Sequence, residues 1–264
     1  MVTQQVRHSK PVEVLGRIGM ACYGVVHILV AWLAIQVVFG DSEQTDQKGA
    51  VAALAETPIG PVLLWALAIG LFAYGLWQLL MVISGYGWII KKRKRITRKI
   101  GAGARGVVGV AIGVYAVQLA TGSGSSGGSS NDKSREATAA LMSAPAGVVL
   151  VGIAALVIIG VAIAAVRKGV KQSFVEDLNE AKLPKIAKPM GTAGYCAKGV
   201  SYAIIGILVG IAAIDANPNE AGGLDAALKT LQQQTFGDVL LFIVAIGFAA
   251  FGVYCFAAAR AHKG

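Results

Sequence analysis

The sequence predicts an all-α membrane protein with six transmembrane helices, arranged as three parallel two-helix repeats. Three observations predict it. Only 14% of the 264 residues are charged and the mean hydropathy is +0.64, whereas a soluble domain of this size carries nearly twice that charge. The charges gather in short clusters between long uncharged tracts, and one glycine motif recurs three times along the chain.

Each predicted span is an apolar tract long enough to cross the bilayer. A helix needs roughly 20 apolar residues to cross about 30 Å of hydrocarbon at 1.5 Å per residue. The first tract is too long for the apolar region of a signal peptide and ends without a small-x-small cleavage site, so it is predicted to be a retained helix. Six tracts qualify: 16–39, 59–84, 101–121, 145–167, 193–214 and 236–259.

The distribution of basic residues predicts the orientation. All but four of the 24 lysines and arginines fall on one side of this topology, including Arg105 and Lys198 just inside helix starts. The other side holds ten of the 14 acidic residues. Because basic residues are retained in the cytoplasm, both termini are predicted to be cytoplasmic in the cell membrane. The net charge of +10 therefore reflects topology, and no motif for binding nucleic acid accompanies it.

Three segments align on the pattern Gly-x4-Gly-Val: "GMACYGVVH" (19–27), "GAGARGVVG" (101–109) and "GYCAKGVSY" (194–202). The second spans match as well, since "AIGLFAYGLW" (68–77) reads against "AIGFAAFGVY" (245–254). The predicted organisation is a cytoplasmic segment (1–13), repeat 1 (14–88), a basic loop (89–100), repeat 2 (101–168), a cytoplasmic linker (169–190), repeat 3 (191–260) and a tail (261–264).

A short amphipathic stretch separates the two spans of each repeat. These stretches read "KGAVAALAETPIG", "REATAALMSAPAG" and "LDAALKTLQQQTFG", and all three are rich in alanine. They predict three short helices on the outer surface. The segment 122–131, rich in glycine and serine, predicts a flexible loop before the second of them.

These motifs resemble the bacterial membrane family catalogued as domain of unknown function 1206, best known from actinobacteria. Its opening motif typically reads Arg-x-Gly-x-x-Ala-Arg-Gly-Val-x-Tyr. The second copy here keeps "ARGV" (104–107), the third has "AKGVSY" (197–202), and the first departs with "CYGVVH" (22–27). The resemblance covers nearly the whole chain from about residue 14. It implies a six-span protein with three repeats and no particular activity.

A stripe of small residues is predicted to pack the first span of each repeat inward. Lipid gives no hydrophobic drive for helix association, so close approach at small residues must supply the attraction. Each repeat begins and ends in the cytoplasm, which favours a pseudo-threefold axis along the membrane normal. The stripe comprises Gly24, Ala31, Gly106, Gly113, Gly199 and Gly206.

His27 is a histidine within an apolar span, near the middle of the bilayer and on the face that carries the stripe. Its repeat equivalents are Gly109 and Tyr202. Gly109 leaves room on this face, so a hydrogen bond between His27 and Tyr202 is predicted. Burying either polar group unpaired would cost a few kcal/mol. Two interpretations stay open: a neutral histidine that helps the helices pack, and a site that handles a proton or a ligand.

The run "KKRKR" also has two interpretations, a patch that contacts anionic lipid headgroups and a simple cytoplasmic retention signal. It comprises Lys91, Lys92, Arg93, Lys94 and Arg95. The three cysteines form no CxxC or Cys/His cluster, so neither a disulfide nor a metal site is predicted.

The sequence lacks the signatures of an enzyme. It has no GxSxG, HExxH or Walker A motif and no carboxylate inside a span, and the loop acids are expected to be solvated. We therefore expect no catalytic residues and no cofactor. The favoured function is a non-catalytic scaffold, accessory or lipid-binding component of the bacterial cytoplasmic membrane. The expected partners are the lipid bilayer, anionic lipid headgroups and an unidentified membrane protein. The alternative is a transporter of a small molecule, lipid or proton, with a site near the repeat axis around His27 and Tyr202.

Overall fold

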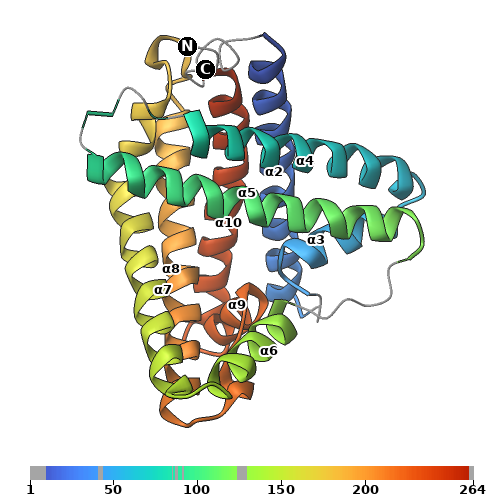
Figure 1. Ribbon diagram of the computed structural model, residues 1–264. Helices are drawn as coiled ribbons and strands as arrows, with labels where there is room; N and C mark the ends of the chain where they lie inside the picture. The colour runs from blue at the N-terminus through green and yellow to red at the C-terminus, as the bar shows by residue number, and fades with distance from the viewer. Residues whose placement is uncertain are drawn as a thin grey trace.

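The computed structural model describes residues 10–40, 44–84, 86, 89–90, 92–123 and 130–261. Most of the predicted N-terminal segment, Lys91, residues 124–129 of the Gly/Ser loop and residues 262–264 of the tail lie outside them. The prediction of an all-α protein with six spans is confirmed, because six helices are long and apolar enough to cross a membrane. These are α2 (Lys10–Val38), α4 (Gly60–Ser84), α5 (Lys92–Ala120), α7 (Gly147–Val170), α8 (Ala187–Ile214) and α10 (Gly237–Ala261) (Figure 1).

A short helix joins the two spans of each repeat, as the amphipathic stretches predict. These helices are α3 (Gln47–Ala55), α6 (Ser130–Met142) and α9 (Leu224–Gln232), and 3-10 turns occur at η1 (Ser173–Asp177), η2 (Glu180–Lys182) and η3 (Pro218–Glu220). The short helices lie away from the end where α2 begins and α10 ends (Figure 1). We call their end of the bundle the linker end, and we call the opposite end, where the first spans begin, the basic end.

Glycine is required where each short helix meets the second span. A Cβ added at Gly60 would lie 2.7 Å from the carbonyl oxygens of both Leu54 and Ala55. Gly147 and Gly237 approach the last carbonyls of α6 and α9 even more closely. A side chain at any of the three positions would collide with backbone, which explains why the same residue recurs in all three repeats.

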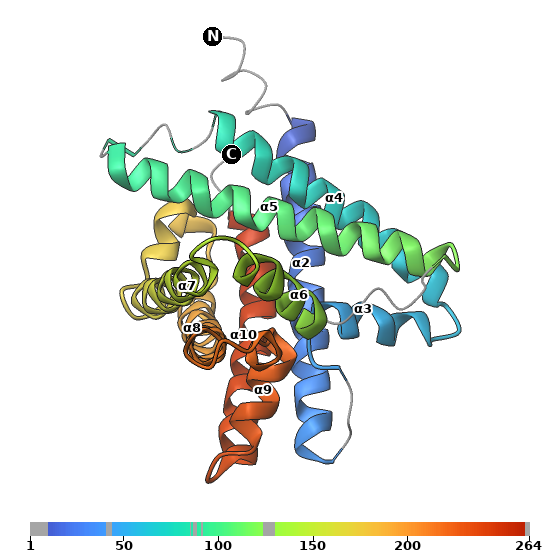
Figure 2. The same ribbon diagram turned by 60° about the horizontal axis from the view of Figure 1, so that its bottom comes forward.

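The second span of each repeat packs along the first span of the next repeat. These pairs are α4 with α5, α7 with α8, and α10 with α2, so the third repeat closes onto the first. Figures 1 and 2 show that the α4–α5 pair runs across the α2–α10 pair. This cyclic order is the one that the predicted pseudo-threefold arrangement requires.

The glycines of the motif stripe form these interfaces between repeats. A Cβ added at Gly24 of α2 would lie 2.8 Å from the carbonyl oxygen of Gly252 of α10. At Gly106 of α5, the equivalent position, it would lie 3.4 Å from the carbonyl oxygen of Gly75 of α4. Gly75 and Gly252 are themselves repeat equivalents, so the two interfaces are formed by equivalent pairs of glycines.

The third interface has the same pairing, with alanine in place of one glycine. Gly199 of α8 faces the carbonyl oxygen of Ala162, which replaces the second-span glycine, at 3.1 Å from an added Cβ. Further along the stripe, Ala31 is buried, Gly113 lies against α4 and Gly206 lies against α7. The stripe therefore faces the neighbouring repeat. It does not line the central axis, contrary to the expected inward packing, because the glycines are needed where two backbones touch.

The middle repeat is splayed apart. In the first and third repeats the two spans also pack together, with Gly19 against Tyr74 and Gly194 against Phe251. Gly101 has the equivalent position in the middle repeat, but an added Cβ there would meet only the side chain of Arg105. In the described part of the chain, α5 and α7 do not pack along each other. The ring of helices is consequently open on this side.

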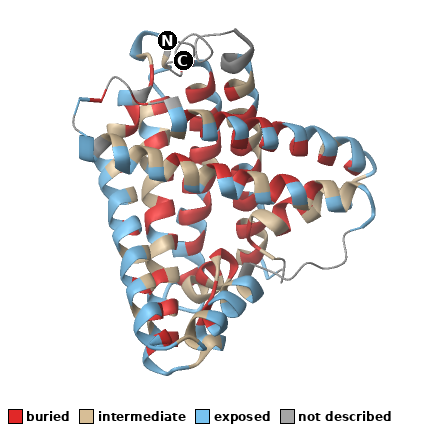
Figure 3. Ribbon diagram, in the orientation of Figure 1, coloured by how far each residue is buried: buried red, intermediate tan, exposed pale blue. Residues whose placement is uncertain are grey.

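The outward faces of the helices are apolar. Figure 3 shows exposed residues along the whole outer side of α7, and Val149, Leu156 and Ile163 on that helix are each more than half exposed. Water would penalise such a surface, whereas the hydrocarbon of a bilayer would not. The outer surface therefore supports insertion into a lipid bilayer.

A buried carboxylate ties the three repeats together at the linker end. Asp225 is 4% exposed and accepts hydrogen bonds from the backbone N–H of Thr45 and from Asn131 Nδ2, both at 2.8 Å. Lys229 Nζ lies 3.2 Å from its Oδ1. These partners come from all three repeats. The expectation that the acids between the spans are solvated is wrong for Asp225, because donors from the other two repeats replace its water.

Candidate functional site

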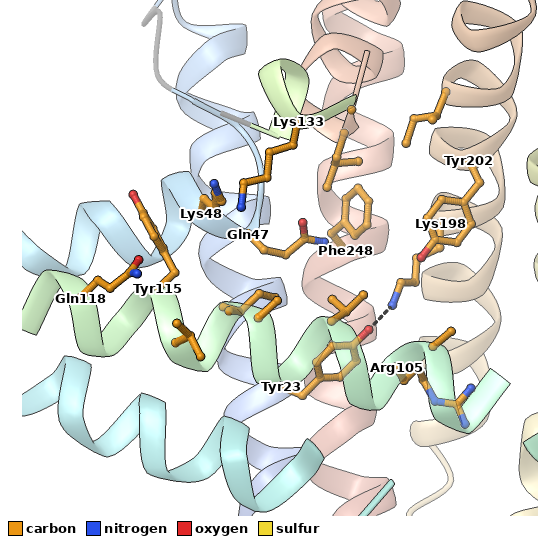
Figure 4. A pocket seen from close by; sticks show the side chains of 18 residues that line it. Tyr23, Gln47, Lys48, Arg105, Tyr115, Gln118, Lys133, Lys198, Tyr202 and Phe248 are labelled. Carbon is orange, nitrogen blue, oxygen red and sulfur yellow. Dashed lines mark hydrogen bonds between the residues drawn. The ribbon is translucent and has the colours of Figure 1, made fainter. Parts of the chain in front are cut away.

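A cavity of about 700 Å³ lies between α5 and α8, where the ring of helices is open (Figure 4). We call it the lateral cavity. Along α5 it extends from Arg105 to Gln118, a length of about 20 Å at the helical rise. Val108 and Val114 line it and are themselves exposed, so the cavity opens sideways toward the bilayer. Its lining also includes Tyr23, Gln47, Lys48, Ala104, Ala111, Ile112, Tyr115, Lys133, Lys198, Tyr202, Ile205, Gly223, Leu224 and Phe248.

The lateral cavity is lined by four cationic side chains, and none of the described residues in its lining carries a carboxylate. Lys48 and Lys133 direct their ammonium groups toward each other at the linker end (Figure 4). Lys48 Nζ lies 5.2 Å from the ring centroid of Tyr115. Burial and then the charge of Lys133 lower the pKa of Lys48, and the charges of Asp46 and Asp132 partly oppose them. An anion placed between the two lysines would relieve their repulsion.

Three equivalent residues meet at the other end of the cavity. Tyr23, Arg105 and Lys198 each stand immediately before the second glycine of the three aligned motifs. Lys198 is 8% exposed, and its Nζ donates a hydrogen bond to Tyr23 Oη at 3.0 Å (Figure 4). The same ammonium lies 3.8 Å from the ring centroid of Phe251. Neither Arg105 nor Lys198 forms an ion pair within the described residues, so both positive charges lie here without a described carboxylate partner.

The predicted polar set lies one turn further along the first spans, but its members do not meet. His27 is 1% exposed, with Nδ1 2.9 Å from the carbonyl oxygen of Tyr23 and with no described hydrogen-bond partner for Nε2. Tyr202 lines the lateral cavity, whereas His27 does not. The predicted His27–Tyr202 hydrogen bond is absent. The space that Gly109 leaves is filled by Tyr74, whose Cδ1 would lie 3.0 Å from an added Cβ, and the histidine turns to its own helix.

A second, smaller cavity of about 70 Å³ lies on the basic-end side of this layer. We call it the axial pocket, because residues of all six long helices line it, among them Tyr23 of α2, Tyr74 of α4, Arg105 of α5, Lys168 of α7 and Tyr195 of α8. Tyr254 of α10 completes the set. Tyr23 and Arg105 line both cavities and so separate them.

The predicted lipid-contact run lies on the first turn of α5 and the residue before it. Lys92 and Arg93 are exposed and Arg95 is half-buried, while Lys91 and the side chain of Lys94 are outside the described residues. Among the residues that the structure describes, no group of three or more His, Cys, Asp or Glu side chains is arranged to hold a metal.

The layer of Tyr23, Arg105 and Lys198 is absent from the site predicted from the sequence, since topology alone accounts for the two cations. The aligned motifs contain the signal that would have found it. The column before the second glycine is polar in all three copies, and it lies four residues before the column of His27. Residues four apart share one face of a helix, so this column is expected on the helix face that carries His27.

The fold and the site define a helical membrane protein of six spans and three cyclically packed repeats, with a cation-lined cavity open to the side.

The chain belongs to the family described as Domain of Unknown Function (DUF1206), whose sequence model matches residues 18–85, 100–172 and 193–262, one segment for each repeat. The resemblance seen in the motifs is confirmed. The chain is similar to the uncharacterized protein YxxB of Bacillus subtilis (strain 168), with 31% identity over 256 residues that cover 94% of this chain and 90% of the relative. No solved structure matches the chain.

Proposed function

We propose that the protein is a non-catalytic component of the bacterial cytoplasmic membrane that binds an anionic lipid in the lateral cavity. The observation that carries this proposal is the combination of an opening toward the bilayer, apolar walls and four cationic side chains in the described lining. Apolar walls with a few placed polar groups are typical of ligand sites of this size. An acyl chain with an anionic headgroup has the matching chemistry.

In this proposal the lipid phosphate lies between Lys48 and Lys133, and an acyl chain lies along α5 and α8 against Ile112 and Ile205. The distribution of basic residues along the sequence predicts that both termini are cytoplasmic, and with this orientation the two lysines would lie at the outer leaflet. A juxtamembrane lysine contributes about 1 kcal/mol to the binding of an anionic lipid.

Replacing both lysines, Lys48→Gln with Lys133→Gln, is expected to weaken retention of anionic lipid about 30-fold, as the loss of about 2 kcal/mol implies. The measurement is the amount of phosphatidylglycerol that stays bound during purification in mild detergent, quantified by mass spectrometry of extracted lipid.

Two other double variants make the result specific. Lys171→Gln with Lys185→Gln makes the same change of charge at exposed positions of the basic end, and it should retain the lipid. Lys92→Gln with Arg93→Gln tests the basic run on α5. If lipid is lost only from that variant, the headgroup is held at the basic run and the lateral cavity is not the site.

The second candidate function is lipid translocation. It is favoured by the two cavities, which lie on opposite sides of the layer formed by Tyr23, Arg105 and Lys198. If the protein translocates lipid, proteoliposomes containing fluorescent phosphatidylglycerol should lose more than the outer-leaflet half of their signal to dithionite. Lys198→Met should change the rate of this signal loss, because the Lys198 ammonium donates a hydrogen bond to Tyr23 in the layer between the two cavities. A loss that stops at half the signal would exclude translocation and leave lipid binding intact.

A further inference from the structure

We propose that the axial pocket binds one small oxyanion group, a phosphate or a carboxylate, held by Arg105 together with the hydroxyl groups of Tyr23 and Tyr74. The site is at the opposite end of the axis from the lysines assigned to the lipid phosphate. The inference does not rest on that assignment.

The pocket presents hydrogen-bond donors. Tyr74 Oη accepts a hydrogen bond from Gln78 Nε2 at 2.8 Å, and Tyr23 Oη accepts one from Lys198 Nζ at 3.0 Å. Because each oxygen already accepts, each phenol proton is left to be donated to another group. Arg105 adds a guanidinium, whose Nη2 makes one long contact of 3.5 Å with Tyr86 Oη. A guanidinium has five donors, so most of its capacity is unused by this contact.

The charged side chains in the described lining of the pocket are cationic. Arg105 and Lys168 line it, and Lys198 lies directly behind Tyr23. Lys168 Nζ lies 4.5 Å from the ring centroid of Tyr195, and none of the described residues that line the pocket carries a carboxylate. Burying cations within a membrane is costly unless a counter-charge accompanies them. Arg105 forms no ion pair with any described residue, and a bound anion would supply its counter-charge.

The size and walls of the pocket select a small group. About 70 Å³ accommodates a few waters or one tetrahedral or planar oxyanion, whereas a larger headgroup would not fit without movement. Aromatic side chains pack closely around it: the rings of Tyr23 and Tyr74 stack at 4.8 Å, and those of Phe174 and Tyr195 at 5.3 Å. The low dielectric of these walls strengthens each charge-assisted hydrogen bond to the anion.

The test uses the full chain in a nonionic detergent without added lipid. Sodium phosphate is titrated against sodium chloride at constant ionic strength, and the unfolding temperature is followed. Phosphate is expected to raise it with saturation, because a ligand that binds only the folded state stabilises that state. Arg105→Gln should weaken the apparent affinity at least about tenfold, and Tyr74→Phe should weaken it about threefold to tenfold. Arg167→Gln, an exposed arginine at the end of α7, should leave the affinity unchanged.

A second titration uses phosphatidylglycerol in mixed micelles in place of phosphate. If only the lipid stabilises the protein and Arg105→Gln removes the effect, the oxyanion is a lipid headgroup. If free phosphate suffices, it is a soluble ion. The proposal is overturned if neither ligand shows saturation, or if the Arg105 and Arg167 variants bind alike. Should Arg105→Gln fail to fold, Tyr74→Phe decides, and an unchanged affinity in that variant overturns the proposal as well.

Discussion

Gly19→Leu is expected to destabilise the protein by about 3 kcal/mol or more, whereas Gly101→Leu, at the equivalent position of the middle repeat, is expected to be tolerated. An added Cβ at Gly19 would lie 2.5 Å from the backbone N and Cα of Tyr74. Backbone of a packed helix cannot move aside cheaply, so overpacking here reaches the upper end of its usual cost. At Gly101 the new side chain would meet only the flexible end of Arg105, 3.4 Å from the Cβ.

The measurement is the temperature at which each variant loses its monodisperse peak after heating in detergent. Gly160→Leu on α7 is the matched control, since an added Cβ there would meet nothing within 4 Å. This variant should lose its peak at the same temperature as the parent protein or slightly above it, because leucine is a better helix former than glycine. If Gly101→Leu lowers this temperature as much as Gly19→Leu does, then α5 packs against α7 in the membrane and the lateral cavity is closed there.

Asp225→Ala is expected to lower the unfolding free energy by about 3 kcal/mol, which corresponds to roughly 10 °C in the unfolding temperature. The change removes the acceptor for the N–H of Thr45 and for Asn131 Nδ2, and it removes the partner of Lys229. A buried donor left without its acceptor costs about 1–3 kcal/mol. The loss should appear in thermal unfolding followed by circular dichroism.

Asp215→Ala is the control for this variant. Asp215 is an exposed acid at the same end of the bundle, where it follows the last turn of α8. The unfolding temperature of Asp225→Asn should lie between those of Asp225→Ala and Asp215→Ala, because the amide keeps one acceptor oxygen. Equal unfolding temperatures for the Ala variants at 225 and 215 would show that the contact among the three repeats at the linker end contributes nothing to stability.

Much of the fold was predictable from the sequence because membrane insertion depends on local properties. Length and hydropathy locate the spans, since every backbone polar group in lipid must be satisfied within its own helix. The recurrence of Gly24, Gly106 and Gly199 reveals the three repeats, and the short amphipathic stretches locate α3, α6 and α9. These features need no knowledge of which helix touches which.

The candidate site was only partly predictable, because contacts between helices decide it. Equivalence among repeats predicts that His27 contacts Tyr202, but it does not reveal that Tyr74 fills the space at Gly109. It also gives no sign that Asp225, in the short helix α9, is buried by residues 94 and 180 positions away.

The sequence by itself determined that this chain is a membrane protein with six spans and three copies of one unit, because hydropathy and repetition are read along the chain. Only the tertiary structure decided that the middle repeat is splayed, and that Tyr23, Arg105 and Lys198 consequently separate two cavities without a carboxylate among their described lining residues. The physical reason is that a helix pair closes or opens according to the atoms on both surfaces. Gly19 and Gly194 have partners across the gap, and Gly101 has none on α7.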